Sequence, residues 1–338
     1  MRTARSVIAL CIAAMPGFAA AQSLPAMIEA CNASQGHAAR QRIEACSAII
    51  RSGKFDPANL AKAYVNRGVG FAELDDYGRA AADFEQAARL DAHLAPAFTN
   101  RGRIRAEMKD YDRAIYDYTH AIRLDPGSAA AFTNRGLAFA AKGDYDAAIT
   151  DHSRALALAP GYAAAANNRG LAYAAQGRFD WAIRDYELAL RIDPGDAAAR
   201  TNLGLAYAAK RDYDRALDAH GQAIALDPES AAPFVNRGLA YAAKQDFARA
   251  IADYDQALRL EPDNAAAYTN RGLARVAGRD YAQALADFTA ALAIDETQVF
   301  ALYGRGLARN ALGDVAGGTA DIRAAIRRGF RRDDRVFE

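Results

Sequence analysis

Cysteine and histidine are scarce in this sequence, and long uncharged runs are missing from most of it. Three cysteines and five histidines are too few and too scattered for a metal cluster or a scaffold held by many disulfides. Basic and acidic residues nearly cancel, 42 against 41, so no bulk positive charge would hold nucleic acid or an anionic membrane. After residue 21 no stretch of about 18 apolar residues lacks a charge, and we expect no membrane span there.

The composition is that of a folded protein. Hydrophobic residues make up 52% of the chain and charged residues 25%, which excludes a disordered chain. The length of 338 residues fits either two ordinary domains or one elongated array. Internal periodicity therefore has to decide between the two.

Residues 1–21 have the pattern of a cleavable secretory signal peptide. Arg2 and Arg5 supply the positive start, a short apolar stretch follows, and Ala19–Ala21 offers the small-residue site before Gln22. The apolar stretch is too short to span a bilayer. We therefore expect export, with a bacterial periplasm as the compartment and secretion as the alternative. A retained anchor or a buried N-terminus is the competing interpretation.

Export would place the two remaining cysteines, Cys31 and Cys46, in an oxidising compartment, where such pairs usually form a disulfide. They lie on two short helical patterns, Pro25–Ala33 and Ala38–Arg51. We expect residues 22–60 to form an N-terminal helical hairpin, which this disulfide would stabilise by about 3 kcal/mol. Two buried free thiols on apolar faces are the alternative.

A tripeptide, Asn-Arg-Gly, recurs every 34 residues along the rest of the chain. It stands at 66–68, 100–102, 134–136, 168–170, 236–238 and 270–272, while Asn-Leu-Gly at 202–204 and Gly-Arg-Gly at 304–306 complete the series. The series defines eight repeats without a gap. They cover 61–94, 95–128, 129–162, 163–196, 197–230, 231–264, 265–298 and 299–332, and a polar tail follows at 333–338.

Each repeat carries two helical patterns, and its places are numbered here from one to thirty-four. In the third repeat Phe132, Gly136 and Phe139, at places four, eight and eleven, fall on one face of a first helix. Ala148 and Ala155, at places twenty and twenty-seven, share one face of a second helix. One such hairpin cannot bury its apolar stripe alone, whereas a stack of hairpins can.

This pattern, which ends with Pro160 at place thirty-two, resembles the tetratricopeptide repeat family over essentially the whole chain after residue 21. The resemblance implies an all-α fold, an α-solenoid of eight tandem hairpins wound as a right-handed superhelix, with the first helices on its inner surface. Chaperone-docking members of the family grip a terminal carboxylate with lysine, arginine and asparagine. Here only the asparagine at place six matches that clamp, so we expect no carboxylate clamp for chaperone C-termini.

A charge pair recurs with the repeat. Place seven is arginine and place twenty-three is aspartate in the same seven repeats, while the fifth repeat has Leu203 and Ala219. Joint loss of both in one repeat predicts a pair inside each hairpin, because pairing between neighbours would leave two charges alone. The expected pairs are Arg67–Asp83, Arg101–Asp117, Arg135–Asp151, Arg169–Asp185, Arg237–Asp253, Arg271–Asp287 and Arg305–Asp321. Incidental surface charges and a ligand-binding row of arginines are the alternatives.

The opposite face of each first helix, at places two, five, six, nine, twelve and thirteen, is nearly uncharged in the middle repeats. Its asparagines each carry two donors and an acceptor, which suits an extended peptide above a leucine and alanine floor. An amphipathic helix is a second candidate ligand. The candidate partner-binding residues are Asn100, Thr133, Asn134, Leu137, Asn168, Leu171, Asn202, Leu205, Asn236, Leu239 and Asn270. Alternatively, the asparagines bond to neighbouring repeats and set their spacing.

The two ends of the array differ from its middle. Lys62, Glu73, Arg103 and Glu107 put charges on the inner face of the first two repeats and could mark one end of a site. The last repeat and the tail are rich in arginine, which we interpret as a solvated terminal cap. Contact with an acidic partner or with lipid headgroups is the alternative.

No catalytic constellation, metal site or cofactor motif is recognisable. His152 and His220 stand at place twenty-four, where other repeats have tyrosine or phenylalanine, and are expected to be core histidines with satisfied hydrogen bonds. Gly68 and Gly70 lie inside a helical repeat and do not follow a strand, so they form no dinucleotide-binding fingerprint.

We therefore predict a non-enzymatic scaffold of the cell envelope that binds a peptide segment or helix of a partner protein in its inner groove. Nucleic acid, a membrane span and cofactors are not expected. The main alternative is a structural protein whose repeats pack against a second copy. A glycan or peptidoglycan binder is the third, disfavoured because the inner face has few aromatic rings.

Overall fold

The structure of the protein, a computed structural model, describes residues 24–32 and 39–331, and α-helices are the regular elements throughout these ranges. The all-α fold expected from the repeats is confirmed. The signal-like segment 1–21 and the tail 333–338 lie outside the described residues.

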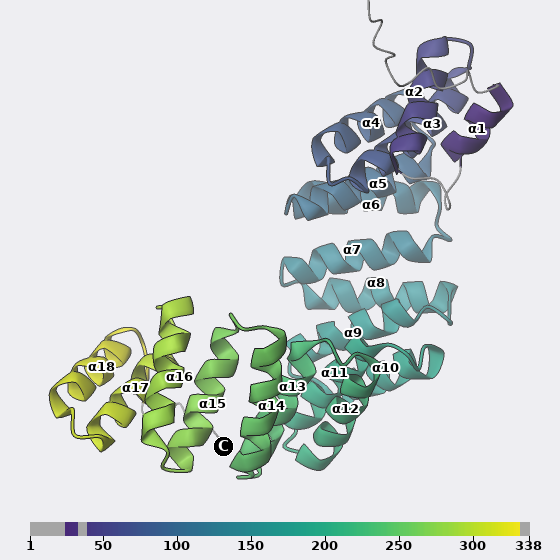
Figure 1. Cartoon of the computed structure of the whole chain (residues 1–338). Coiled ribbons are helices and arrows are strands. Elements are labelled where there is room, and N and C mark those ends of the chain that lie inside the picture. Colours follow the sequence, from purple (N-terminus) through teal and green to yellow (C-terminus); the bar gives the residue numbers. More distant parts are fainter. Residues whose placement is uncertain (1–23, 33–38, 332–338) are drawn as a thin grey trace, which may run out of the picture. The chain divides into compact units, whose positions relative to one another are not determined.

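The helices follow one another as antiparallel pairs (Figure 1). The N-terminal pair is α1 (Leu24–Asn32) and α2 (Ala39–Ser52). The first helices of the repeats are α3 (Pro57–Ala72), α5 (Ala95–Glu107), α7 (Ala129–Ala141), α9 (Ala163–Ala175), α11 (Ala197–Ala209), α13 (Ala231–Ala243), α15 (Ala265–Ala277) and α17 (Val299–Ala311). The second helices are α4 (Tyr77–Leu90), α6 (Tyr111–Leu124), α8 (Tyr145–Leu158), α10 (Phe179–Ile192), α12 (Tyr213–Leu226), α14 (Phe247–Leu260), α16 (Tyr281–Ile294) and α18 (Val315–Arg327).

One helix starts earlier than expected. The α3 helix begins at Pro57 and so crosses the boundary drawn between 60 and 61. The side chain of Asp56 accepts a hydrogen bond from the backbone N–H of Asn59 at 2.9 Å, and proline suits the first helical turn. This start signal lies outside the 34-residue period, which is why the period alone misses it.

The helices form two compact units, residues 1–126 and residues 127–338. Of the described residues, α1 to α6 belong to the N-terminal unit and α7 to α18 to the C-terminal unit. The boundary lies two residues before the end of the second repeat. Each unit contains apolar clusters of its own.

The same turn closes most hairpins. In the third repeat Gly143 has a φ of 82°, and the side chain of Asp144 accepts a hydrogen bond from the backbone N–H of Ala147 at 3.1 Å. Glycine adopts positive φ at little cost, and the aspartate satisfies an N–H that the helix start leaves unpaired. The fourth repeat differs, because Arg178 stands at the start of α10 and provides no such bond.

Small residues let the two helices of a hairpin approach closely. Gly136 on α7 faces His152 on α8, and a Cβ atom on that glycine would come within 2.7 Å of the imidazole ring. Gly170 stands in the same relation to Tyr186. Ala148 on α8 is completely buried. The small residues at places eight and twenty therefore allow the two helices of a hairpin to pack closely.

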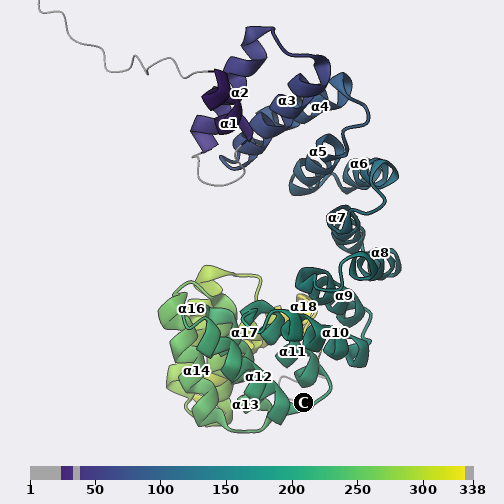
Figure 2. The ribbon, with the colours of Figure 1, turned by 90° about the vertical axis from the view of Figure 1, so that its right-hand side faces the viewer.

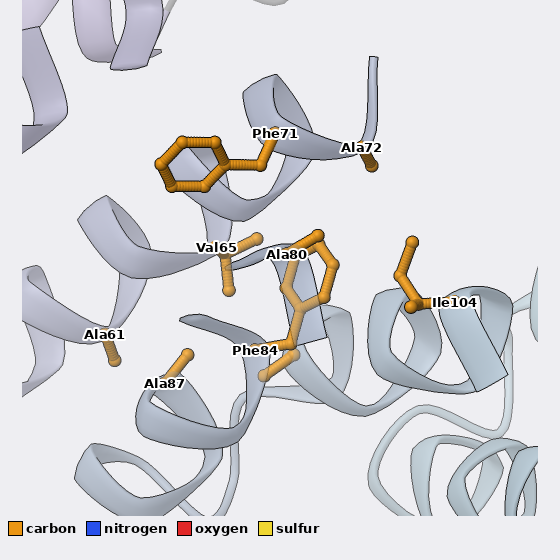
Figure 3. Packing of buried hydrophobic residues seen from close by; sticks show 9 residues of the cluster. Ala61, Val65, Phe71, Ala72, Ala80, Phe84, Ala87 and Ile104 are labelled. Atoms are coloured by element: carbon orange, nitrogen blue, oxygen red, sulfur yellow. The ribbon is translucent and has the colours of Figure 1, made fainter. Parts of the chain in front are cut away.

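Within each unit, the next repeat covers the apolar flank that the preceding hairpin leaves open. Figure 3 shows Phe84 of α4 lying between Val65 of α3 and Ile104 of α5. Phe84 and Ile104 are completely buried, and Ile104 belongs to the following repeat. Since full burial of such a side chain stabilises by about 1.5–3 kcal/mol, each hairpin depends on its neighbour for stability.

The first helices lie closer together than the second helices. Within each unit the second helix of one hairpin packs against the first helix of the next, as α8 does on α9. Neighbouring first helices such as α7 and α9 also contact each other, whereas no two second helices do within the described ranges. Each stack therefore curves with its first helices on the inner side. Figure 2 shows α7 and α9 on one side and α8 and α10 on the other.

The N-terminal hairpin continues the stack as a shortened unit. Cys31 and Cys46 form the expected disulfide, which joins α1 to α2. Asn32 precedes Asn66 by 34 residues, and the Asn66 side-chain amide donates to Asn32 Oδ1 at 3.2 Å. The α1 helix contacts α3 as one first helix contacts the next. It therefore occupies the position of a preceding first helix.

An aromatic side chain packs at the C-terminal end of the array, in addition to the exposed Arg327 and Arg328 of the expected solvated cap. Phe330, which follows α18, is buried and stacks on Tyr303 of α17 with ring centroids 3.9 Å apart. The ring of Phe300 packs edge-on against the ring of Phe330, with ring centroids 5.7 Å apart. Phe330 stands at place thirty-two, where most repeats have proline, and its ring covers the flank that a further hairpin would bury.

Candidate functional site

The arginines at place seven and the aspartates at place twenty-three pair inside each hairpin. In the third repeat Arg135 donates from Nε to Asp151 Oδ2 at 2.7 Å and from Nη2 to Oδ1 at 2.8 Å. The same two-bond contact recurs in Arg67–Asp83, Arg101–Asp117, Arg169–Asp185, Arg237–Asp253, Arg271–Asp287 and Arg305–Asp321. All seven aspartates are buried. The pairs thus join the two helices of a hairpin, and their arginines do not form a free row for ligands.

Arg67, Arg169 and Arg271 also contact the preceding hairpin, a role that reasoning within one repeat missed. Arg169 Nη1 donates to Ser153 Oγ at 3.0 Å, and Arg271 Nη1 donates to Asp255 Oδ1 at 2.6 Å. Ser153 and Asp255 both stand at place twenty-five. The hydrogen bond to Asp185 raises the pKa of Arg169 above its usual value. One guanidinium therefore stabilises both the hairpin and the contact between hairpins.

Three repeats have arginine at place eleven in place of the aromatic side chain. Arg105, Arg275 and Arg309 donate to Asp117, Asp287 and Asp321 at 2.7, 2.7 and 2.9 Å. Each of these aspartates therefore accepts hydrogen bonds from two arginines. The sequence shows these substitutions, but the expected pattern for place eleven was only an aromatic ring.

The asparagines at place six lie partly exposed on the first helices, and they differ in their partners. Asn66 and Asn202 bond to the preceding hairpin, Asn202 through Asn167 Oδ1 at 3.0 Å. Asn100 donates to the Pro96 carbonyl oxygen at 3.0 Å within its own helix. Asn66 and Asn202 therefore fit the alternative in which the asparagines set the spacing between neighbouring hairpins. In the described part of the chain the others accept and donate no side-chain hydrogen bond: Asn134, Asn168, Asn236 and Asn270.

Four leucines at place nine lie beside these amides and are exposed to solvent. Their exposed fractions are 44% for Leu137, 42% for Leu171, 45% for Leu205 and 37% for Leu239. Leu273, at the same place in the seventh repeat, is only 7% exposed, so the exposed row ends there. We call Asn134, Asn168, Asn236 and Asn270 with Leu137, Leu171, Leu205 and Leu239 the amide–leucine surface.

Thr133 does not belong to this surface, contrary to the expectation. Its side chain is 2% exposed, and its Oγ1 has no hydrogen-bond partner within the described residues. Thr201, at the same place two repeats later, instead donates to the Ala197 carbonyl oxygen at 2.9 Å. Thr133 is therefore buried in the packing of its own region and does not line the groove.

The charged residues at the N-terminal end are partly engaged. Arg42 of α2 is buried and donates to Glu73 Oε1 at 2.8 Å. Lys62 is exposed and lines a cavity of about 300 Å³ together with apolar and polar residues of α1, α2 and α3, among them Ile28 and Asn59. The expectation that these charges mark the end of a site stays a prediction.

The two core histidines are buried as expected but not hydrogen-bonded as expected. His152 and His220 are completely buried, and neither nitrogen of either ring has a partner within the described residues. Burial, with a smaller effect of Arg169 on His152 and of Arg237 on His220, lowers both pKa values to about 4. Both rings are therefore neutral near pH 7, and both lie against a glycine of the first helix.

Metal-ligand clusters and membrane-spanning helices are both absent from residues 24–32 and 39–331. No three histidine, cysteine, aspartate or glutamate side chains there are grouped so that they could hold a metal ion. No helix there has the length and the apolar character that a bilayer crossing requires.

Sequence models of the tetratricopeptide repeat match this chain. A model described as a TPR repeat matches residues 102–143, 136–177 and 238–278. Models described as a tetratricopeptide repeat match 163–196 and 199–232. Together the matched residues make up half of the chain. A search of curated proteins found no match.

Several solved structures share the fold. A tetratricopeptide repeat protein from Parabacteroides merdae is 21% identical, with 74% of this chain and 99% of that chain covered and a TM-score of 0.59. A chain of the APC/C hetero-tetramer Cut9–Hcn1 is 17% identical, with 80% and 52% covered and a TM-score of 0.61. PilF of Pseudomonas aeruginosa is 18% identical, with 61% and 94% covered and a TM-score of 0.55.

Proposed function

This chain belongs to the tetratricopeptide repeat family, and from that premise we propose that the amide–leucine surface of its C-terminal unit binds a segment of a partner protein. Repeats of this family generally mediate protein–protein interactions and generally act as non-enzymatic scaffolds. The proposed role is that of a scaffold that holds its partner on the inner side of the first helices.

The observation that carries this proposal is the combination of free amides with exposed leucines. Four asparagines lack side-chain partners within the described residues although their equivalents Asn66 and Asn202 bond to a neighbour. A continuous row of exposed leucines on a folded protein is typical of a binding surface. Places two, five, six, nine, twelve and thirteen carry no charge from the third to the seventh repeat, so the partner segment is expected to be uncharged where it makes contact.

An extended segment fits this surface better than a helix. A helix satisfies its own backbone N–H and C=O groups, whereas an extended chain leaves them free for other partners. Asparagine side chains both donate and accept, and a row of them can therefore pair with an extended backbone irrespective of its side chains. The leucines beside them would contact the apolar side chains of the same segment.

We also propose that the protein acts in the cell envelope after export. The signal-like pattern of residues 1–21 and the disulfide between Cys31 and Cys46 support this location, because such bonds persist mainly in oxidising compartments. Sequencing of the N-terminus of the protein purified from a periplasmic extract tests it. The expected first residue is Gln22, and an intact Met1 would contradict export by cleavage.

A site-specific photo-crosslinker tests where the partner binds. We expect p-benzoylphenylalanine at Leu171 to form a cross-link to another protein in cells, and the same residue at Ala157, on the exposed side of α8, to form none. Mass spectrometry then identifies the cross-linked protein. Equal cross-linking at both positions would contradict the assignment of the surface, and a cross-link to a second copy of this chain would instead support self-association.

Replacement of the free amides tests the chemistry of binding. The triple variant Asn134→Ala, Asn168→Ala, Asn236→Ala should bind the identified partner at least about tenfold more weakly, since each lost hydrogen bond contributes about 0.5–1.5 kcal/mol. Asn66→Ala, which removes an amide engaged with Asn32, is the matched control. Unchanged affinity of the triple variant, with an unchanged circular dichroism spectrum, would rule out the amides as the binding groups.

A further inference from the structure

A cavity of about 230 Å³ lies between α11 and α13, the first helices of the fifth and sixth repeats. Ala198 and Thr201 of α11 and Ala232 and Pro233 of α13 line it, and Ala223 of α12 lies behind them. Ala198 and Ala232 are exposed, while Ala223 is completely buried. The cavity therefore runs from the inner surface of the stack into the space between two hairpins.

The sixth repeat shows what normally fills this space. Place four of the first helix carries a large apolar side chain in most repeats: Tyr64, Phe98, Phe132, Phe234, Tyr268 and Leu302. Phe234 is buried and packs against Ala257 of its own second helix and Ala267 of the following first helix. The residues one repeat earlier that correspond to Ala257 and Ala267 are Ala223 and Pro233, and both line the cavity.

The fifth repeat lacks the ring at this place. It has Arg200 instead, and the guanidinium of Arg200 does not fill the space. Its Nη1 donates to Gln222 Oε1, and its Nη2 donates to the Pro194 carbonyl oxygen at 3.4 Å. The cavity thus corresponds to the position that an aromatic ring at place four occupies in the sixth repeat.

We propose that this cavity binds an aromatic side chain of a partner segment, so that the ligand supplies the ring that the fifth repeat lacks. The proposal rests on the proposed function, because the segment would lie on the amide–leucine surface, whose Leu205 and Leu239 stand on α11 and α13, the two helices that line the cavity. An apolar cavity of about 150 Å³ is large enough for a benzene molecule, so this one has room for the ring of phenylalanine or tyrosine. Asn202 and Asp227 at its edge offer oxygen acceptors for a phenol hydroxyl.

Titration of the full chain with p-cresol, the side-chain analogue of tyrosine, tests the cavity without any peptide. NMR is expected to show saturable shifts of the methyl signals of Ala198 and Ala232. These shifts should disappear in Arg200→Phe, because the protein's own ring then fills the space, and persist in the matched variant Arg200→Ala, which leaves the space empty. Absent shifts in the wild-type chain, or equal shifts in Arg200→Phe, would overturn the proposal.

The phenylalanine variant should fold, because Phe132 and Phe234 occupy the same place in other repeats. Its melting temperature is expected to rise, since a filled cavity adds contacts. If Arg200→Phe fails to fold, Ala232→Leu replaces it, because the larger side chain obstructs the cavity from its exposed end. The p-cresol shifts of Ala198 should then disappear in Ala232→Leu.

Panning of a phage-displayed library of random dodecapeptides on the wild-type and Arg200→Phe chains then tests the ligand. The wild-type chain should select an aromatic residue at one fixed position, and Arg200→Phe should lose that preference at least tenfold while still selecting apolar peptides. Equal aromatic preference on both chains would overturn the inference yet leave the proposed function intact. Selection that is insensitive to the Asn134, Asn168 and Asn236 replacements would instead refute the proposed function and leave the p-cresol result standing.

Discussion

The fifth and sixth repeats are neighbours that form the same helical hairpin, but a buried ion pair joins the two helices in one and apolar side chains take its place in the other. The sixth repeat joins α13 to α14 through the buried pair of Arg237 and Asp253. The fifth has Leu203 and Ala219 at the same places, and both are buried. The backbone hairpins nevertheless begin and end at equivalent residues. The fold therefore does not require the ion pair, but once one member is present the other has to accompany it.

A second difference follows from the first. Glu187, at place twenty-five of the fourth repeat, faces a hairpin that has no arginine at place seven. It accepts a hydrogen bond from the hydroxyl group of Tyr207 on α11 at 3.0 Å instead. A hydrogen bond to place twenty-five therefore joins these two hairpins as well, but its donor is a tyrosine hydroxyl and not an arginine. Substitutions in these two repeats can therefore separate the contribution of the charge pair to stability from that of the surrounding apolar packing.

Removal of one member of the pair should have the largest effect. We expect Asp253→Ala to lower the free energy of unfolding by about 3 kcal/mol, the lower end of the range for broken buried pairs, because Arg237 stays partly exposed. Urea denaturation measures the loss, and hydrogen exchange of α13 and α14 locates it. Asp218→Ala, at an exposed aspartate of the fifth repeat, is the control and should cost less than about 0.5 kcal/mol. Equal losses would mean that the pair does not stabilise the hairpin.

Acid should destabilise the fifth repeat more than the sixth. Burial lowers the pKa of His220 to about 4, whereas the unfolded chain titrates near 6.5. As pH falls below 6.5 the unfolded chain therefore takes up the proton first, and stability is lost until about pH 4. At pH 5 the loss amounts to about 2 kcal/mol relative to pH 7.5.

The matched variant for this experiment is His220→Tyr, which places on α12 the residue found at the same place in the sixth repeat, Tyr254. Urea midpoints at pH 7.5 and pH 5 should differ less in this variant than in the wild-type chain. A pH dependence that is unchanged by the substitution would show that His220 is not the responsible group.

The hydrogen bond between hairpins should have a smaller effect. Tyr207→Phe removes the hydroxyl that donates to Glu187 and is expected to cost about 1 kcal/mol, because hydrogen bonds to partly exposed carboxylates are modest. Tyr241→Phe in the sixth repeat is the matched control, since Arg249 lies over its ring as Arg215 lies over that of Tyr207. Thermal melting of the two variants gives the difference, and identical melting temperatures would contradict this role of Glu187.

The smallest net effect is expected for the double variant Arg237→Leu, Asp253→Ala, which gives the sixth repeat the residues of the fifth. Replacement of a whole buried pair by apolar residues is often nearly neutral. We expect a loss of no more than about 1 kcal/mol, so that the two single losses are strongly non-additive. If the losses of the single variants simply add, direct pairing of the two side chains would be disproved.

The fold was predictable because its signal repeats. The 34-residue recurrence of Asn-Arg-Gly places every first helix from α5 onward at its observed start, and the joint loss of arginine and aspartate in one repeat was enough to pair them. The start of α3 was missed, since Asp56 and Pro57 stand outside the period. The packing of Phe330 was not predicted, because no other repeat has an aromatic residue at place thirty-two and the period therefore gives it no role.

The candidate site was predictable only in part, because exposure depends on neighbours as well as on place in the repeat. Leu239 and Leu273 share place nine, yet one is exposed and the other is buried. Thr133 shares the face assigned to Asn134 by helical spacing, but the adjacent helix covers it. The cavity at Arg200 needed coordinates, since the sequence does not tell where a long side chain in place of a ring will point.

The contacts of the Arg169 and Arg271 guanidiniums with the preceding hairpin distinguish individual junctions of the array from one another. Because every repeat has the same length, excision of residues 231–264 would keep the alternation of helices and would look harmless in an alignment. It would, however, bring Gly221 opposite Arg271 in place of Asp255, whose carboxylate now binds that arginine. Shuffled or shortened versions of this chain would therefore differ in how firmly each junction holds, and a library of such deletions would rank the junctions by what stands at place twenty-five.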